Sequence, residues 1–258
     1  MTALNRARDL PLLAAFLSLA CLASGSLRAD IYDDAVAHAG RPDKDVKRDE
    51  IDHPAEVLRL SGIRPGWRVA DFMGANGYYS ELLSYVVGPG GHVYLLNNVA
   101  YDDWSEGHWK QRIEGRLPNV EHRTVDFERL GLPSGWLDAV LMIKVYHDLY
   151  WIDDDPKDHW PKFNVDRVLR EASRVLKKGG ILVVEDHSAK EGTGSSAAGD
   201  LHRIDEAYTV ADFQKHGFQL IGKSDALRRP DDPRDQITYK GPMVGKTDRF
   251  VLVFRKIG

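Results

Sequence analysis

Side chains that can hold a polar ligand or move a proton recur in this sequence directly after short apolar runs. Asp71, Asn97 and Asp126 each follow such a run, and the pair His147-Asp148 follows another. Carboxylates and amides bind hydroxyl and amine hydrogens, and an imidazole beside a carboxylate can accept a proton near neutral pH. Open α/β sheets bind ligands at the carboxyl ends of their strands. We therefore expect these positions to meet at one ligand site.

The turn after the first apolar run is built from small residues. Gly74-Ala75-Asn76-Gly77 separates that run from a helix. Small residues let a ligand approach the backbone closely, and the start of a helix adds unpaired N–H groups. Asn97 lies twenty residues after Gly77, where nucleotide-binding folds place a side chain that contacts ribose. The alternative interpretation is a glycine turn needed only for tight packing.

Imidazole and carboxylate groups are also the candidates for proton transfer. The candidate catalytic residues are His147, Asp148, His187 and His202, with Asp186 beside them. They can act as general bases toward a hydroxyl or a protonated nitrogen. The same groups could bind a divalent metal ion, although the sequence assigns no metal site. For each histidine, a structural hydrogen bond or an exposed position is the alternative.

Three further groups have both a functional and a structural interpretation. One set of aromatic residues either walls an apolar pocket or packs a loop onto the sheet: Tyr146, Tyr150, Trp151 and Trp160. A basic set either binds an anion or forms a mixed-charge surface, which the interleaved Asp231, Asp232 and Asp235 favour: Arg228, Arg229, Arg234 and Lys246. The segment Lys190–Asp200 is either a lid or an ordinary loop.

Strands and helices alternate along the chain and must position these groups. The predicted strands are Trp67–Met73, His92–Leu96, Val120–Val125, Leu137–Val145, Ile181–Glu185, Phe218–Lys223 and Arg249–Arg255. The predicted helices are one from Pro54, Tyr79–Val87, Ser105–Arg116, Val165–Leu176 closed by Gly179-Gly180, and Val210–His216. Little helix separates the last two strands, which indicates an antiparallel partner. The fold class is therefore α/β, with a mostly parallel seven-stranded sheet and one antiparallel edge strand.

The first 29 residues have the pattern of a signal peptide. Arg6 and Arg8 precede an uncharged apolar run, and Leu27-Arg28-Ala29 offers a cleavage site. The predicted organisation is a signal peptide over 1–29, an N-terminal arm and helix over 30–66, and a domain over 67–258. We expect a periplasmic or secreted protein. An uncleaved anchor and lipidation at Cys21 are the weaker alternatives.

Composition excludes several classes of protein. The 258 residues are 43% hydrophobic and 29% charged with a net charge of −4, which is typical of a globular chain. Because there is no basic excess, we expect a small-molecule substrate and no nucleic acid, and no stable membrane insertion after signal cleavage. The single cysteine excludes a disulfide framework within one chain. The oligomeric state stays open.

Taken together, these motifs resemble those of the class I S-adenosylmethionine-dependent methyltransferases. The motifs are Asp71 to Gly77, Asn97, Asp126-Phe127, Asp138-Ala139-Val140 and Leu176 to Ile181. Within that class the chain resembles a bacterial, often exported group of predicted methyltransferases. The strings that carry this second likeness are Arg48-Asp49 before Pro54-Ala55-Glu56, His202 to Asp205, and Gly245 to Phe250.

The resemblance implies a Rossmann-like methyltransferase sandwich and a cofactor, S-adenosylmethionine. Its methionine moiety would be held by Asp71 with Gly74, Asn76 and Gly77. Asn97 would meet the ribose, Asp126 the adenine amino group, and Phe127 the adenine ring. The chain departs from the usual motif at Met73 and Ala75, where glycines are usual, and at Asn97, where an acid is usual.

The function implied is methyl transfer from S-adenosylmethionine to an unidentified small molecule. An exported non-catalytic protein that reuses the fold to bind another ligand is the alternative, and the departures at Ala75 and Asn97 favour it. An NAD-linked oxidoreductase is disfavoured because the turn lacks the G-x-G-x-x-G pattern. A hydrolase is disfavoured because no G-x-S-x-G motif is present.

Overall fold

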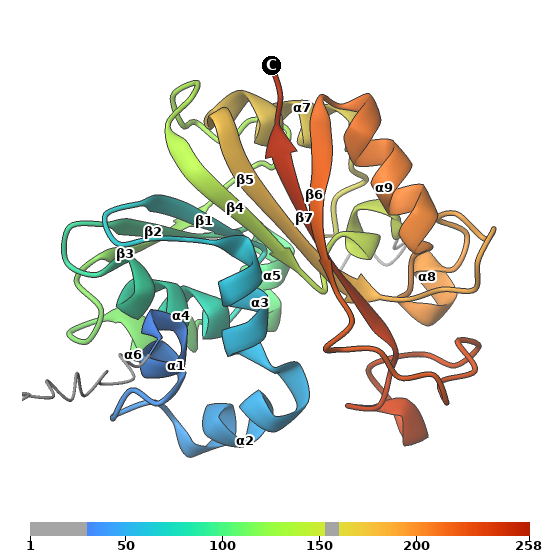
Figure 1. The fold of residues 1–258 in the computed structure, drawn as a ribbon, viewed down its shortest axis with the longest axis horizontal. Helices are drawn as coiled ribbons and strands as arrows, with labels where there is room; N and C mark the ends of the chain where they lie inside the picture. Colours follow the sequence, from blue (N-terminus) through green and yellow to red (C-terminus); the bar gives the residue numbers. More distant parts are fainter. Residues whose placement is uncertain (1–29, 153–159) are drawn as a thin grey trace, which may run out of the picture.

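A seven-stranded sheet forms the centre of the structure, a computed structural model that describes residues 30–152 and 160–258. The strand order is β3-β2-β1-β4-β5-β7-β6 (Figure 1). The bounds are β1 Arg68–Phe72, β2 His92–Asn97, β3 Val120–Thr124, β4 Leu137–Ile143, β5 Leu176–His187, β6 Phe218–Ser224 and β7 Arg249–Lys256. The predicted α/β class is confirmed. The antiparallel strand is β7, which lies one position in from the edge, between β5 and β6.

Helices cover both faces of this sheet. One face packs against α1 Ile31–Val36, α3 Pro54–Ser61, α4 Tyr78–Val87 and α6 Trp109–Ile113, and the other against α7 Val165–Val175 and α9 Glu206–Lys215 (Figure 1). Alternate strand residues serve the two faces: Val69 packs in the α4 layer, and Ala70 in the α7 layer. This is the two-residue period of a strand that is buried on both sides. The remaining short elements are α2 Asp43–Asp52, α5 Val99–Trp104, α8 Ala198–Leu201, η1 His147–Tyr150 and η2 Gly241–Met243.

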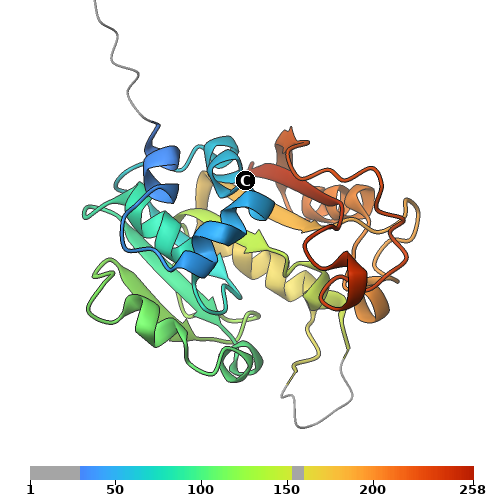
Figure 2. The same ribbon diagram turned by 90° about the horizontal axis from the view of Figure 1, so that it is seen from below.

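The N-terminal arm is part of the hydrophobic core. Val57, Leu58 and Tyr32 are buried in the same cluster as the strand residues of the α4 layer. Gly62, with a φ of 65°, ends α3 in the left-handed conformation expected of a C-terminal glycine. Arg112 of α6 donates to Asp45 of α2 and to the carbonyl of Asn76, at 2.6 Å each, so it ties the arm to the turn after β1. Figure 2 shows the blue helices of the arm lying across the sheet.

One predicted helix and the predicted closure of another are wrong in the structure. The helix expected over 105–116 is replaced by α5 and α6, because Glu106 and Gly107 adopt φ values of 50° and 69° that no right-handed helix contains. Gly179-Gly180 do not close α7, since β5 begins at Leu176 and both glycines lie in its first, irregular part. There a Cβ on Gly180 would lie 2.8 Å from the carbonyl oxygen of Lys177.

The signal-peptide prediction and Cys21 lie outside the described residues. Within 30–152 and 160–258, none of the helices combines the length and the apolar character needed to cross a membrane.

Candidate active site

The turn between β1 and α4 is tight and partly left-handed. Met73, Ala75 and Gly77 have φ values of 50°, 52° and 76°. A Cβ on Gly74 would lie 2.4 Å from Oδ2 of Asp71, so only glycine fits there. The two departures from the usual glycine motif thus fall on left-handed positions, where a residue with a Cβ costs roughly 1–2 kcal/mol. The turn has the expected shape in spite of its sequence.

Asp71 is buried beneath this turn. Its side chain accepts a hydrogen bond of 2.7 Å from Ser80 Oγ and is 2% exposed. Burial raises the pKa of the Asp71 carboxyl to about 6, against the opposing effect of the hydrogen bonds from Ser80. A buried carboxylate with no close cationic partner is stabilised by any positive charge that binds beside it.

Asn97 holds the turn from the end of β2. Its Oδ1 accepts from the Ala75 N–H at 2.9 Å, and its Nδ2 donates to the Ala75 carbonyl at 3.1 Å and to Asp102 at 2.9 Å. Asn97 is fully buried. In this structure the side chain predicted to meet ribose is therefore engaged with the protein.

Asp102 is an acidic residue beside Asn97 that was not among the predicted site residues. It accepts from Asn97 and His122 through Oδ1 and from Thr124 through Oδ2, at 2.9, 2.7 and 2.5 Å. An open hollow of about 430 Å³ adjoins it, lined in part by Trp109. Asp102 lies five residues beyond the end of β2, and this position alone could have indicated a side chain at the site. The helix was expected to begin only at Ser105, so the short helix α5 that carries Asp102 was not predicted.

Two amide atoms near the turn are buried without a hydrogen-bond partner among the described residues. They are Oδ1 of Asn76, within the turn, and Nδ2 of Asn98, which directly follows β2. An unpaired buried polar atom costs about 1–3 kcal/mol, so such atoms usually await a ligand or water. An unmatched acceptor and an unmatched donor on this edge of the sheet fit a polar cofactor such as S-adenosylmethionine.

The pair predicted to meet adenine is divided between surface and core. Asp126 is exposed, and its Oδ1 accepts from the Glu128 N–H at 2.8 Å. Phe127 is 1% exposed and packs against Phe72 and Phe163, with ring centroids 5.2 and 6.5 Å away. Asp126 is thus accessible to a ligand, whereas the ring of Phe127 belongs to the core.

The candidate catalytic residues converge at the carboxyl ends of β4 and β5. His147 Nδ1 lies 2.6 Å from Asp186 Oδ1, and its Nε2 lies 3.1 Å from Asp148 Oδ1 and 3.3 Å from His202 Nδ1. Tyr101 of α5 donates its hydroxyl to Asp148 Oδ2 at 2.6 Å. We call His147, Asp148, His202 and Asp186 the histidine–carboxylate cluster.

The cluster favours a positive charge at its centre. Burial alone would lower the pKa of His147, but the carboxylates of Asp148 and Asp186 outweigh it and raise the pKa to about 10. Burial opposes ionisation of Asp148 as well, yet His147 holds the pKa of this carboxyl below its usual range.

His187 lies beside this cluster and does not join it. Its Nδ1 is 2.8 Å from Thr247 Oγ1, and its ring centroid is 6.1 Å from that of His147. Burial, followed by the charge of His147, lowers the pKa of His187 well below its usual value. A neutral, hydrogen-bonded histidine is the structural alternative that the sequence left open.

The aromatic residues divide between the two interpretations. Trp151 packs against His202 with centroids 5.0 Å apart, and Trp160 packs against Trp151 at 4.9 Å. These rings wall the cluster. The hydroxyls of Tyr146 and Tyr150 instead both donate to Asp212 at 2.6 Å and tie η1 to α9.

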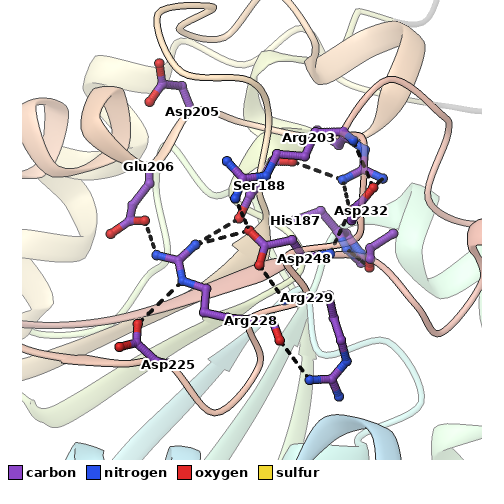
Figure 3. A network of polar contacts seen from close by, with 12 residues as sticks. His187, Ser188, Arg203, Asp205, Glu206, Asp225, Arg228, Arg229, Asp232 and Asp248 are labelled. Atoms are coloured by element: carbon purple, nitrogen blue, oxygen red, sulfur yellow. Dashed lines mark hydrogen bonds and ion pairs between the residues drawn. The ribbon is translucent and has the colours of Figure 1, made fainter.

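Two of the four basic residues, Arg228 and Arg234, are ion-paired within the protein, whereas Arg229 donates to the carbonyl of Arg228 and Lys246 is exposed. Arg228 bonds Glu206 and lies 3.2 Å from Asp248 (Figure 3). Arg234 lies 2.8 Å from the same carboxylate. Arg203 is fully buried and bonds Asp232 through two nitrogens, at 2.8 and 3.2 Å. This network anchors the loop beside the cluster, in agreement with the mixed-charge interpretation.

Comparison with known proteins shows which class the chain resembles. Residues 76–184 match the sequence profile of a family described as "Methyltransferase domain". A S-adenosylmethionine-dependent methyltransferase of Aquifex aeolicus has a similar structure, with a TM-score of 0.58 at 20% identity, over 83% of this chain and 97% of that one. Residues 76–184 are therefore similar to a methyltransferase domain, and the chain has the Rossmann-like fold of the class I methyltransferases.

Sequence relatives within that class are named for quinone biosynthesis. The chain is similar to the "ubiquinone/menaquinone biosynthesis C-methyltransferase UbiE" of Vibrio vulnificus, at 29% identity over 72% of this chain and 66% of that protein. The namesake of Vibrio parahaemolyticus is 33% identical, over 67% of this chain and 59% of its own length. The chain thus spans less than two thirds of each relative.

The fold by itself does not identify the reaction. The [4+2]-cyclase SpnF is as similar in structure as the Aquifex protein, with a TM-score of 0.58 at 17% identity, over 80% of this chain and 83% of that one. Function must be argued from the residues of the site.

Proposed function

We propose that this protein transfers a methyl group from S-adenosylmethionine to a small-molecule acceptor. The observation that carries the proposal is the position of α5. This helix begins after Asn98, beside the turn, and its Tyr101 donates a hydrogen bond to Asp148 of the histidine–carboxylate cluster. One short helix thus joins the expected cofactor site to the groups that could act on an acceptor.

The residues around the turn would hold the cofactor. Asp71 supplies a buried negative charge near the methionine moiety, and the amides of Asn76 and Asn98 supply an unmatched acceptor and donor. Asp126 is accessible for the adenine amino group. When bound, S-adenosylmethionine supplies an electrophilic methyl group on a sulfonium, which leaves as a neutral thioether when a lone pair of the acceptor forms the new bond.

The cluster would orient the acceptor and favour the loss of its proton. Methyl transfer depends mainly on positioning of the reacting atoms. Trp151 and Tyr239 lie 5.0 and 4.7 Å from the ring of His202, which favours an aromatic or apolar acceptor. The names of the quinone-biosynthesis relatives agree with that acceptor class.

Titration calorimetry of the purified protein with S-adenosylmethionine and S-adenosylhomocysteine tests the proposal. We expect micromolar dissociation constants, with binding abolished in Asp71→Ala and Asp126→Ala. Asp235→Ala is the control and should bind normally, because Asp235 pairs with Lys190 and with none of the residues of the turn. Binding weaker than about 1 mM to folded protein, or unchanged affinity in both variants, would overturn the proposal. Binding without transfer to phenolic and other aromatic acceptors would favour a non-catalytic ligand-binding protein.

We also propose that the protein is exported and cleaved after Ala29. The support is the sequence pattern of residues 1–29. Cell fractionation followed by N-terminal sequencing should find a periplasmic or secreted chain that begins at Asp30. A cytosolic chain that retains Met1 would contradict this, and a membrane-bound chain that begins at Cys21 would indicate lipidation.

A further inference from the structure

Three donor atoms of the histidine–carboxylate cluster meet at distances that suit a common metal ion. His147 Nε2, Asp148 Oδ1 and His202 Nδ1 are separated by 3.1, 3.3 and 3.5 Å. Bonds of about 2.0–2.2 Å from nitrogen or oxygen to one ion separate neighbouring ligands by roughly 3.0–3.5 Å in octahedral or tetrahedral geometry. All three spacings fall in that range.

Asp186 orients the ring of His147 so that its Nε2 can bind a metal ion. Asp186 is fully buried, and its Oδ1 accepts from His147 Nδ1 at 2.6 Å while its Oδ2 accepts from the His147 backbone N–H at 2.9 Å. Because a carboxylate only accepts, a proton sits on Nδ1, and a metal ion that displaces the other proton of the ring would find the lone pair of Nε2 directed toward Asp148 and His202. A carboxylate behind a histidine is the usual outer support of a metal-binding imidazole.

Asp148 is supported in the same way. Tyr101 donates to its Oδ2, which leaves Oδ1 directed toward the two imidazoles. The carboxylates of Asp148 and Asp186 would together balance the charge of a divalent ion.

The third ligand comes from a separate segment that is held firmly in place. His202 ends α8 with a φ of 50°, a left-handed conformation that costs about 1–2 kcal/mol and needs support from its surroundings. The adjacent Arg203 supplies that support: it bonds Asp232 and donates to the carbonyls of Ser188 and Gln236 at 3.0 and 2.8 Å (Figure 3). Its ion pair with Asp232 is fully buried.

We propose that His147, Asp148 and His202 bind one divalent first-row transition-metal ion. Two imidazoles and one carboxylate favour Zn²⁺, Co²⁺ or Fe²⁺ over Mg²⁺, which prefers oxygen ligands. Three protein ligands leave positions open, as in catalytic rather than structural metal sites. Trp151 and Tyr239 pack against the ring of His202 beside the proposed ion. Binding of the ion does not depend on methyl transfer.

Metal binding by the full protein tests this inference without any cofactor. After chelator treatment, we expect one equivalent of Zn²⁺ or Co²⁺ to bind with a dissociation constant below about 1 µM, and Mg²⁺ not to compete. The visible spectrum of bound Co²⁺ should show imidazole coordination. Wild-type protein that binds neither ion more tightly than about 100 µM would overturn the inference, whatever the variants do.

Matched variants locate the ion. His202→Gln and Asp148→Asn should lose the equivalent of metal, and Asp186→Asn should weaken binding about 10- to 100-fold because it acts through His147. His216→Gln is the control, since the side chain of that histidine is 4% exposed, as is that of His147, and lies beside the carboxylate of Asp166 outside the cluster. Circular dichroism verifies that each variant is folded. Unchanged binding in folded His202→Gln would place the metal elsewhere and reject the proposed ligands.

Discussion

Asp71 shows, at the scale of one residue, how the burial of a carboxyl group costs stability. Its carboxyl is buried with a hydroxyl as its hydrogen-bond partner, and its nearest influential cations, Arg48 and Arg112, only partly offset the desolvation. The group therefore holds its proton more tightly in the folded chain than in the unfolded one.

This difference predicts a pH dependence. Because the pKa of Asp71 rises from about 3.9 unfolded to about 6 folded, its contribution to stability is full below pH 4 and is lost as the pH rises through 6. Asp71→Asn should therefore raise the free energy of unfolding by about 2–3 kcal/mol at pH 7.5 and by little at pH 4. Denaturant unfolding of both proteins at the two pH values measures this. The same difference at both values would show that ionisation of Asp71 is not the cause.

At the scale of an element, the turn after β1 also contains residues whose backbone conformation costs stability. Met73 and Ala75 both adopt left-handed backbone conformations, but only Met73 also buries its side chain, at 1% exposure. The two positions should thus respond oppositely to the glycine that the usual motif contains.

Ala75→Gly should raise the free energy of unfolding by about 0.5–1 kcal/mol, since relief of the left-handed strain exceeds the added entropy of the unfolded chain. Met73→Gly should lower it by about 2–5 kcal/mol, because it leaves a cavity in the core. Thermal and denaturant unfolding give both values. Destabilisation by Ala75→Gly would mean that the Ala75 methyl group makes packing contacts worth more than the strain.

At the scale of the whole molecule, the N-terminal arm and the sheet form one core. Leu58 and Val57 of α3 pack in the same cluster as Val69 of β1 and Val251 of β7, the first and the last strand of the chain. We therefore expect the arm and the sheet to unfold in one transition.

Leu58→Ala tests whether the arm and the sheet unfold together. Because Leu58 is fully buried, its truncation should lower the free energy of unfolding of the whole chain by about 2–5 kcal/mol. Val46→Ala in α2 is the control: Val46 is 49% exposed, and its truncation should change stability by less than about 0.5 kcal/mol. Calorimetry would reveal the alternative as two separate transitions, with only the smaller one shifted by Leu58→Ala.

The sequence by itself determined the order of strands and helices and the placement of polar groups at strand ends. Apolar residues recur every 2 residues in a strand and every 3.6 in a helix because one face of each element is buried. For this reason β1, α4, β4 and α7 agree with their predicted ranges to within two residues. The helix expected over 105–116 failed because Glu106 adopts a left-handed conformation that apolar spacing does not encode.

Only the tertiary structure decided which polar groups are used within the protein and which stay available. Asn97 is engaged by Ala75, and His187 by Thr247, sixty residues away along the chain. His202 meets His147 across 55 residues because the buried Arg203 anchors its segment. Periodicity is a local property of the sequence, whereas hydrogen-bond partners depend on segments that meet only when the chain has folded.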